Sequence, residues 1–386
     1  MKRVLQGILD VFSSLGLSCV LLTLLGLLTY LGTLEQVDTG LFEVQKKYFE
    51  SFVLLHDFGP FSLPLPGANL VMCVLFVNLV LGGMVRLRRG WGTFGVFVTH
   101  IGILMMLVAG FVKNYYSVEG NLLLYEGQSA AEFRSYHRWE LVVLEELAPG
   151  RLREHPVREE SLLRASGAQG TLFRSDALPF DLVVTRFLRN CQVLPKGPMF
   201  DVSVPVIDGV FLREEPLDRE AESNVAGAYV TAVARDGKRT EGLVWGNERQ
   251  PMPLVVNGKR FGIHLRKELH PLPIAVRLDK FTKEEHPRTM MAKTYSSDVT
   301  VSESSGTRAV KISMNQPLRE QGFVLYQSSW GPQDAPPGTP LFSVLQVVRN
   351  PSDQWPLYSC LVIAAGLLIH FTRKLTRYIR LEHAKP

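Results

Sequence analysis

The stretch Gly92-Thr-Phe-Gly-Val-Phe-Val-Thr-His100-Ile-Gly-Ile-Leu-Met-Met-Leu-Val-Ala-Gly-Phe-Val112 decides the fold, because it is long and apolar enough to cross a bilayer as one helix. Its one ionisable residue is His100. An ionisable side chain at membrane depth is costly and usually faces a partner, a cavity or a bound ligand. Imidazole is also a common ligand of haem iron. His100 is therefore the first candidate for a functional residue.

Three further stretches predict transmembrane helices, at about 15–34, 68–85 and 355–372. The first follows Lys2 and Arg3 as a signal peptide would. Its apolar run is too long for one, however, and it lacks a small-x-small cleavage site, so we expect a retained anchor. With 92–112, the sequence predicts three helices in the N-terminal part and one near the C-terminus.

Basic residues predict the orientation of these helices. They gather before the first helix, between the second and third, and after the fourth: Lys2, Arg3, Arg86, Arg88, Arg89, Arg373, Lys374, Arg377, Arg380 and Lys385. By the positive-inside rule these segments lie in the cytoplasm, together with both termini. These ten basic residues exceed the net charge of the whole chain, which is +5, so the remaining residues together are not basic. We therefore expect no nucleic-acid partner.

The long segment 113–354 is large enough for a domain with its own core, placed outside the cytoplasm. Alternating apolar runs predict strands at 181–187, 228–234, 274–281, 298–301 and 342–348. Asp236-Gly237, Asn257-Gly258 and Ser304-Ser-Gly306 predict hairpin turns between strands. Helix is expected only near 130–133 and 213–222. The fold class is therefore an α+β membrane protein with four transmembrane helices and a large antiparallel β-rich extracytoplasmic domain.

Other chemistry is sparse. Cys19, Cys73 and Cys360 lie in the membrane stretches, and Cys191 alone lies outside them. No Cys-x-x-Cys for thiol exchange and no Cys-x-x-Cys-His for covalent haem is present, and no catalytic nucleophile is readable. The histidines outside the helices lack metal-ligand spacing and are expected at the surface or in packing. They are His56, His137, His155, His264, His270 and His286.

His100 has two readings: it packs two helices together, or it binds a ligand. The glycines around it, Gly95 and Gly102 among them, would admit another helix or a flat ligand equally well. His370, in the fourth helix, lies about 8 Å from His100 in depth at a rise of about 1.5 Å per residue, and is expected to reach the inner interface. This chain would then supply one intramembrane ligand, and a partner the other.

The sequence resembles the ResB family, a component of the system II machinery for cytochrome c biogenesis. The resemblance rests on segments in the family's order: Ser14-Leu-Gly-Leu with Tyr30-Leu-Gly-Thr33, then His100-Ile-Gly-Ile103, then Ile312-Ser-Met-Asn315-Gln-Pro317 and Gly322-Phe-Val-Leu-Tyr326-Gln-Ser. Before the fourth helix the chain has Asn350-Pro351-Ser352 where the family usually has Asp-Pro-Gly.

The resemblance implies a subunit of the cell (inner) membrane that works with a CcsA/ResC-type partner. Together the two would carry haem b across the membrane and present it for covalent attachment to apocytochrome c. His100 would be an axial ligand of the haem iron, and the partner would supply the opposing histidine. The chain would be an accessory subunit of a cytochrome c synthase (haem lyase) complex with no catalytic residue of its own. A thiol-reducing membrane protein is a further expected partner.

The expected division is 1–112 for the N-terminal membrane part, 113–354 for the extracytoplasmic domain, and 355–386 for the last helix and tail. One alternative is a membrane-anchored assembly or chaperone factor, in which His100 only packs helices and no haem site exists. The other is a membrane redox enzyme, which would normally need stacked histidine pairs at two depths. The chain offers one such candidate, so we rank this alternative last.

Overall fold

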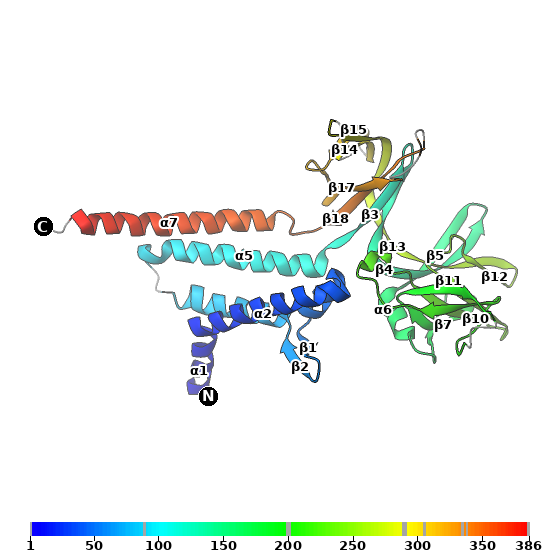
Figure 1. The fold of residues 1–386 in the computed structure, drawn as a ribbon, viewed down its shortest axis with the longest axis horizontal. Coiled ribbons are helices and arrows are strands. Elements are labelled where there is room, and N and C mark those ends of the chain that lie inside the picture. Colours follow the sequence, from blue (N-terminus) through cyan, green and yellow to red (C-terminus); the bar gives the residue numbers. More distant parts are fainter. Residues whose placement is uncertain are drawn as a thin grey trace. The chain divides into compact units, whose positions relative to one another are not determined.

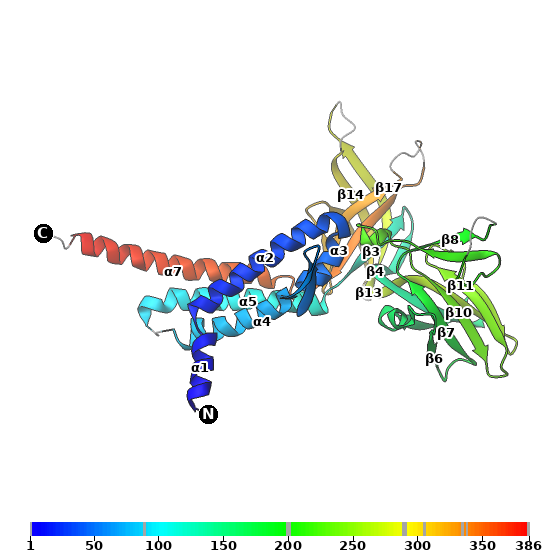
Figure 2. The same ribbon diagram turned by 60° about the horizontal axis from the view of Figure 1, so that its bottom comes forward.

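The computed structural model describes residues 2–87, 90–197, 202–287, 292–303, 306–332, 336 and 339–383. Arg88, Arg89, Lys385 and the Ser304-Ser305 part of one predicted turn lie outside these ranges. The chain folds into two compact units (Figures 1 and 2). The membrane unit comprises 1–118 and 349–386, and the β unit comprises 119–348.

The membrane unit is mainly helical. Its elements are α1 (Lys2–Phe12), α2 (Leu15–Thr39), α3 (Leu41–Val44), the π-helix η1 (Gln45–Phe49), β1 (Val53–Asp57), β2 (Ser62–Pro66), α4 (Ala68–Asn78), the π-helix η2 (Leu79–Val85), the 3₁₀ turn η3 (Trp91–Thr93), α5 (Phe94–Tyr116) and α7 (Trp355–His383). Strands β1 and β2 form an antiparallel hairpin. Helices α2 and α5 finish, and α4 and α7 begin, at the same end of this unit as the hairpin. We call it the hairpin end.

The four predicted spans are confirmed. Helix α2, α4 with η2, η3 with α5, and α7 are all long and apolar enough to cross a membrane. Three of them exceed the predicted bounds, since α2 runs to Thr39, α5 to Tyr116 and α7 to His383. Hydropathy marks only the part of a helix that suits lipid. The basic stretch after Thr372 is charged yet rich in good helix formers, so α7 continues through it.

A buried asparagine ties the first two long helices together. The amide nitrogen of Asn78 donates to the carbonyl oxygens of Phe12 (2.8 Å) and Ser14 (3.0 Å). Its amide oxygen accepts from the Ser18 hydroxyl (2.6 Å). Asn78 is therefore satisfied in an apolar setting, where an unpaired amide would be costly. Towards the hairpin end, α2 instead packs through leucines onto η1 and β1, with Leu28 and Tyr48 almost fully buried.

The β unit holds nearly all the remaining strands. They are β3 (Val118–Tyr125), β4 (Ser129–Ala148), β5 (Arg151–Arg158), β6 (Thr171–Phe173), β7 (Phe180–Leu188), β8 (Cys191–Pro195), β9 (Val210–Glu214), β10 (Gly227–Ala234), β11 (Arg239–Trp245), β12 (Met252–Val256), β13 (Lys259–Glu285), β14 (Ala292–Glu303), β15 (Gly306–Ser313), β16 (Leu318–Glu320), β17 (Phe323–Gly331) and β18 (Phe342–Arg349). Short helices are α6 (Glu159–Leu162), η4 (Leu163–Ala165) and η5 (Ala221–Ser223).

The strand pairings are antiparallel, as predicted. The largest sheet has the order β15-β14-β13-β4-β3-β18-β17-β16, with β5 on β4 and β12 on β13. A second sheet has the order β11-β10-β7-β6, and β8 pairs with β9. Apolar side chains of β4, β12 and β13 form one core with those of β7, β10 and β11. The long strands β4 and β13 thus hold a sandwich at one end and continue into the rest of the large sheet.

Two predicted hairpin turns are confirmed, and the helix expected at 130–133 is wrong. Positive φ angles at Asn257 (51°), Gly258 (77°) and Gly237 (86°) fit the tight turns that asparagine–glycine and aspartate–glycine pairs favour. Residues 130–133 belong to β4 and pair with β13, so tertiary pairing overrides their local helix propensity. The helix expected at 213–222 is reduced to η5, after the end of β9.

An ion network joins three strands of the β unit. Arg266 on β13 donates from Nε to Glu140 on β4 (2.8 Å) and from Nη1 to Glu154 on β5 (3.0 Å). Glu140 is only 5% exposed, so its charge depends on this partner. We expect Arg266→Met to lower the free energy of unfolding by about 2 kcal/mol, less than for a fully buried pair because Glu154 is exposed to water.

Denaturation of the full-length chain in detergent, followed by circular dichroism of the sheet, measures this loss. Adding Glu140→Gln to Arg266→Met should recover part of it, since the buried charge is removed. Arg213→Met, which breaks an exposed pair with Glu215, serves as the control and should cost less than about 0.5 kcal/mol. Equal losses for the two arginine variants would contradict a buried network.

Candidate functional site

His100 is a residue of α5, and its side chain faces the π-helical segment η2. Its Nδ1 atom is 2.9 Å from the carbonyl oxygen of Gly83. A Cβ atom on Gly83 would lie 2.8 Å from that Nδ1, so only glycine lets the imidazole come this close. Single π-helical turns within α-helices occur frequently at functional sites. Here the π-helix provides both the carbonyl and the space for the histidine.

This contact fixes which nitrogen of His100 is available. A carbonyl oxygen only accepts hydrogen bonds, so Nδ1 carries the proton and, in the neutral ring, Nε2 has a free lone pair. Within the described part of the chain, Nε2 makes no hydrogen bond. Histidines that bind metals usually donate their other ring proton to a carbonyl or carboxylate in the same way. The ring is therefore oriented to bind a metal through Nε2. His100 and its contact with Gly83 fit the role of a haem iron ligand.

The glycines near His100 have another task. A Cβ on Gly95 would lie 2.6 Å from the backbone nitrogen of His370, and one on Gly102 would lie 2.9 Å from that of Ile363. From the other side, a Cβ on Gly366 would lie 2.5 Å from the backbone nitrogen of Thr99. Gly95 and Gly102 therefore bring α5 and α7 into close backbone contact, as small residues do in membrane helices. They pack a helix, and the face of α5 that carries His100 is a different one.

An apolar cavity of about 720 Å³ lies between α2, α4 and α5, on the hairpin side of His100. Its walls include Leu25, Met72, Phe76, Leu107 and Phe111. Leu107 and Phe111 follow His100 by about two and three helical turns and so share its face of α5. The volume falls in the range typical of small-molecule sites. We call this cavity the apolar chamber.

His370 is placed apart from His100. Its backbone lies against Gly95, five residues before His100 on α5. At about 1.5 Å per residue this separates the two histidines by about 7.5 Å along the helices. Its ring lies edge-on to Phe371, with 5.3 Å between centroids.

Arg86, the described member of the basic turn after η2, is held by α1. It donates to the Asp10 carboxylate and to the Ser13 hydroxyl. These contacts indicate that Arg86 holds the turn after η2 against the end of α1.

The histidines of the β unit are dispersed in separate packing and hydrogen-bond contacts. His155 lies 3.4 Å from Glu145, His264 lies 3.2 Å from the carbonyl of Glu248, and the ring of His270 packs on Phe133. Burial lowers the pKa of His270, which keeps it neutral. Among the described residues, no three histidine, cysteine or acidic side chains are arranged to hold a metal ion.

Cys191 and Lys267 are among the other groups of the β unit whose pKa values are shifted. Burial and the charge of Glu214 raise the pKa of the Cys191 thiol to about 12, so this cysteine is an inert thiol at neutral pH. Burial lowers the pKa of Lys267 to about 8, against the opposing charges of Glu159 and Glu222. The Lys267 amine donates to the Tyr136 carbonyl (2.9 Å) and lies 4.3 Å from the centre of the Trp139 ring. It is a packed structural group.

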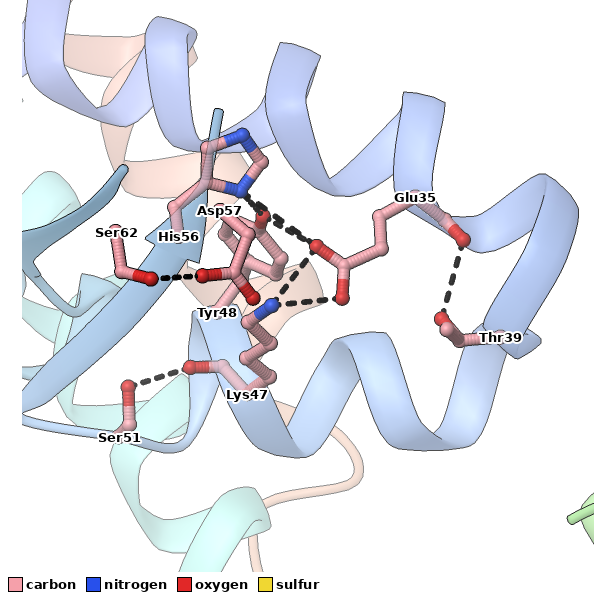
Figure 3. Close-up of polar contacts among 8 residues, drawn as sticks. All are labelled: Glu35, Thr39, Lys47, Tyr48, Ser51, His56, Asp57 and Ser62. Carbon is pink, nitrogen blue, oxygen red and sulfur yellow. Dashed lines mark hydrogen bonds and ion pairs between the residues drawn. The ribbon is translucent and has the colours of Figure 1, made fainter. Parts of the chain in front are cut away.

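Sequence reasoning missed one polar cluster, at the hairpin end of the membrane unit (Figure 3). Glu35 at the end of α2 meets Lys47 and Tyr48 of η1 and His56 of β1. Tyr48 is fully buried. We call these four residues the Tyr48 cluster. The order Glu–Lys–Tyr–His along the chain has no regular spacing, so only the folded hairpin brings them together.

Part of the chain matches a known protein family. Residues 85–149 and 250–338 match the model of the ResB-like family. The first segment contains α5 with His100, and the second contains strands β12 to β17. No curated protein matches the chain.

Proposed function

We propose, from the match of residues 85–149 and 250–338 to the ResB-like family, that the chain is a haem-carrying subunit of a cytochrome c synthase. A role in cytochrome c biogenesis, as a multi-pass membrane protein, follows from the family and the four apolar helices. The proposal adds the task of this subunit. It binds haem iron through Nε2 of His100 while haem passes from the cytoplasmic side of the membrane to the other.

The observation that carries the proposal is the hydrogen bond from His100 Nδ1 to the Gly83 carbonyl. It orients the ring and leaves Nε2 with the lone pair that iron needs. The apolar chamber, next along the same helix face, suits the apolar macrocycle of haem b.

The second axial ligand comes from a CcsA/ResC-type partner in this proposal. Among the described residues, the other histidine within a membrane span is His370, at a different depth and on α7. One chain thus offers one ligand at the depth of His100. Two histidines from two subunits would give six-coordinate iron.

Charge supports an orientation of the membrane unit. Most of its described basic residues lie at the end opposite the hairpin, on α1, after η2 and on the last part of α7. The basic residues at the hairpin end, Lys46, Lys47, Lys113 and Arg349, lie among acidic residues such as Glu35, Glu43, Glu50 and Asp353. By the positive-inside rule the end opposite the hairpin faces the cytoplasm, and the hairpin end and the β unit face outward. The β unit would then receive apocytochrome c or a thiol-reducing membrane protein.

The absorption spectrum of the complex, purified together with the partner, tests this function. We expect the wild type to show a six-coordinate, bis-histidine haem spectrum. His100→Ala should lose it, and added imidazole should restore it by filling the place of the missing ring. His370→Ala is the matched control and should leave the spectrum unchanged. An unchanged spectrum in His100→Ala would instead favour an assembly factor without a haem site.

A further inference from the structure

We propose that His56 is a second haem-iron ligand of this chain, at the hairpin end, where haem leaves the apolar chamber. The inference rests on the proposed function, because it adds a second station to the route that begins at His100. It starts from the Tyr48 cluster, in which one imidazole is held by a buried phenol and a carboxylate (Figure 3).

The hydrogen-bond directions in the cluster follow from counting protons. Lys47 donates to both oxygens of Glu35, at 2.8 and 3.0 Å, which is the arrangement of an ionised carboxylate. An ionised carboxylate only accepts, so the Tyr48 hydroxyl donates its one proton to Glu35 at 2.7 Å. The contact between the Tyr48 oxygen and His56 Nδ1 must then be donated by His56. In the neutral ring, the lone pair lies on Nε2.

The donors thus run in one direction, from His56 through Tyr48 to Glu35. This chain of donors resembles the carboxylate–histidine arrangement that orients metal-binding imidazoles. In Figure 3, the second ring nitrogen of His56 points away from Tyr48 and Glu35.

The surroundings of His56 suit an apolar, planar ligand. The Phe58 ring lies edge-on to the imidazole with 4.5 Å between centroids, and Phe61 stacks on Phe58 at 5.6 Å. The hairpin also exposes Phe58, Phe61 and Leu63, and Leu63 pairs with His56 across the hairpin. An exposed apolar patch of this kind marks a site that another apolar surface covers. With an imidazole lone pair beside it, the occupant that fits is an iron macrocycle with apolar edges.

The hairpin is coupled to the apolar chamber through η1. Phe49, which follows Tyr48 in the chain, lines the chamber. Asn69, another lining residue, donates from its amide nitrogen to the carbonyl of Glu50 at 2.7 Å. The end of η1 therefore contributes to the wall of the chamber on one side and to the support of His56 on the other.

Titration of ferric haem into the purified full-length chain in detergent micelles tests this inference. We expect two sites in the wild type, one in His100→Ala, one in His56→Ala and none in the double variant. In the His100→Ala background, His56→Ala should weaken haem binding at least tenfold. Added imidazole should restore this binding, whereas it would not repair a folding defect. Tyr48→Phe, which keeps the ligand but removes its anchor, should weaken the same site severalfold. His264→Ala is the matched control.

The outcomes separate the two claims. If His56→Ala leaves haem binding in the His100→Ala background unchanged, the second station is overturned while the proposed function stands. If His100→Ala binds haem as the wild type does, the proposed function fails, whatever His56 does. Loss in His56→Ala that imidazole does not repair also overturns the role of His56 as a ligand.

Discussion

Cells whose only copy of the chain carries His100→Ala are expected to make c-type cytochromes with at least about tenfold less covalent haem. Changes in the residues that merely orient a metal-binding histidine commonly cost 10- to 100-fold in affinity or activity, so removal of the ligand itself should cost no less. Within the described residues, Nε2 of His100 forms no hydrogen bond, so its lone pair is available to iron. Haem-stained gels of the membrane fraction measure the product.

The chain must be shown to reach the membrane in normal amount, by immunoblot. His370→Ala, the other intramembrane histidine, should mature cytochromes at the wild-type level. Imidazole in the growth medium should partly rescue His100→Ala. Normal cytochrome haem in His100→Ala at normal chain level would mean that the histidine only packs α5 against η2.

Gly366→Leu is expected to separate α7 from α5. A Cβ atom at this position would lie 2.5 Å from the backbone nitrogen of Thr99 and 2.8 Å from the carbonyl oxygen of Gly95. Backbone atoms cannot turn aside as a flexible side chain can, so the helices must move apart. We expect a cost of about 3 kcal/mol, at the upper end for overpacked interiors.

Unfolding of the full-length chain in mixed micelles, followed by the loss of helical circular dichroism, measures this cost. Gly26→Leu on α2 is the matched control, because a Cβ there meets nothing within 4 Å. Its stability should be that of the wild type or slightly higher, since leucine is the better helix former. A Gly366→Leu chain as stable as the control would show that the close contact of α5 and α7 is not formed.

The helices and most of the strands could be predicted from the sequence, because burial in lipid and alternation in a sheet leave direct marks on it. The C-terminal end of α7 could not, since the basic residues after Thr372 form helix without being apolar. Residues 130–133 were misassigned because their pairing partners lie on β13, far along the chain. Long-range pairing of this kind has no local signal.

The candidate site was predicted only in part. His100 stands out as an imidazole in an apolar run, yet its contact with Gly83 depends on the π-helix, which no pattern announces. The sequence does not show whether Gly95 and Gly102 face a ligand or a helix, because their neighbours on α7 lie far along the chain. His56 looked like one surface histidine among several, because Glu35 and Tyr48 approach it only through the fold of the hairpin.

Replacing the ligand by a chemically different one tests the central claim most directly, the claim that His100 binds haem iron. The measurement is the absorption and electron paramagnetic resonance spectrum of oxidised haem in the complex of His100→Cys with its partner. We predict a thiolate-ligated spectrum, distinct from those of the wild type and of His100→Ala, because thiolate is itself a haem ligand. A His100→Cys complex with the haem content and spectrum of the wild type would contradict iron binding by His100.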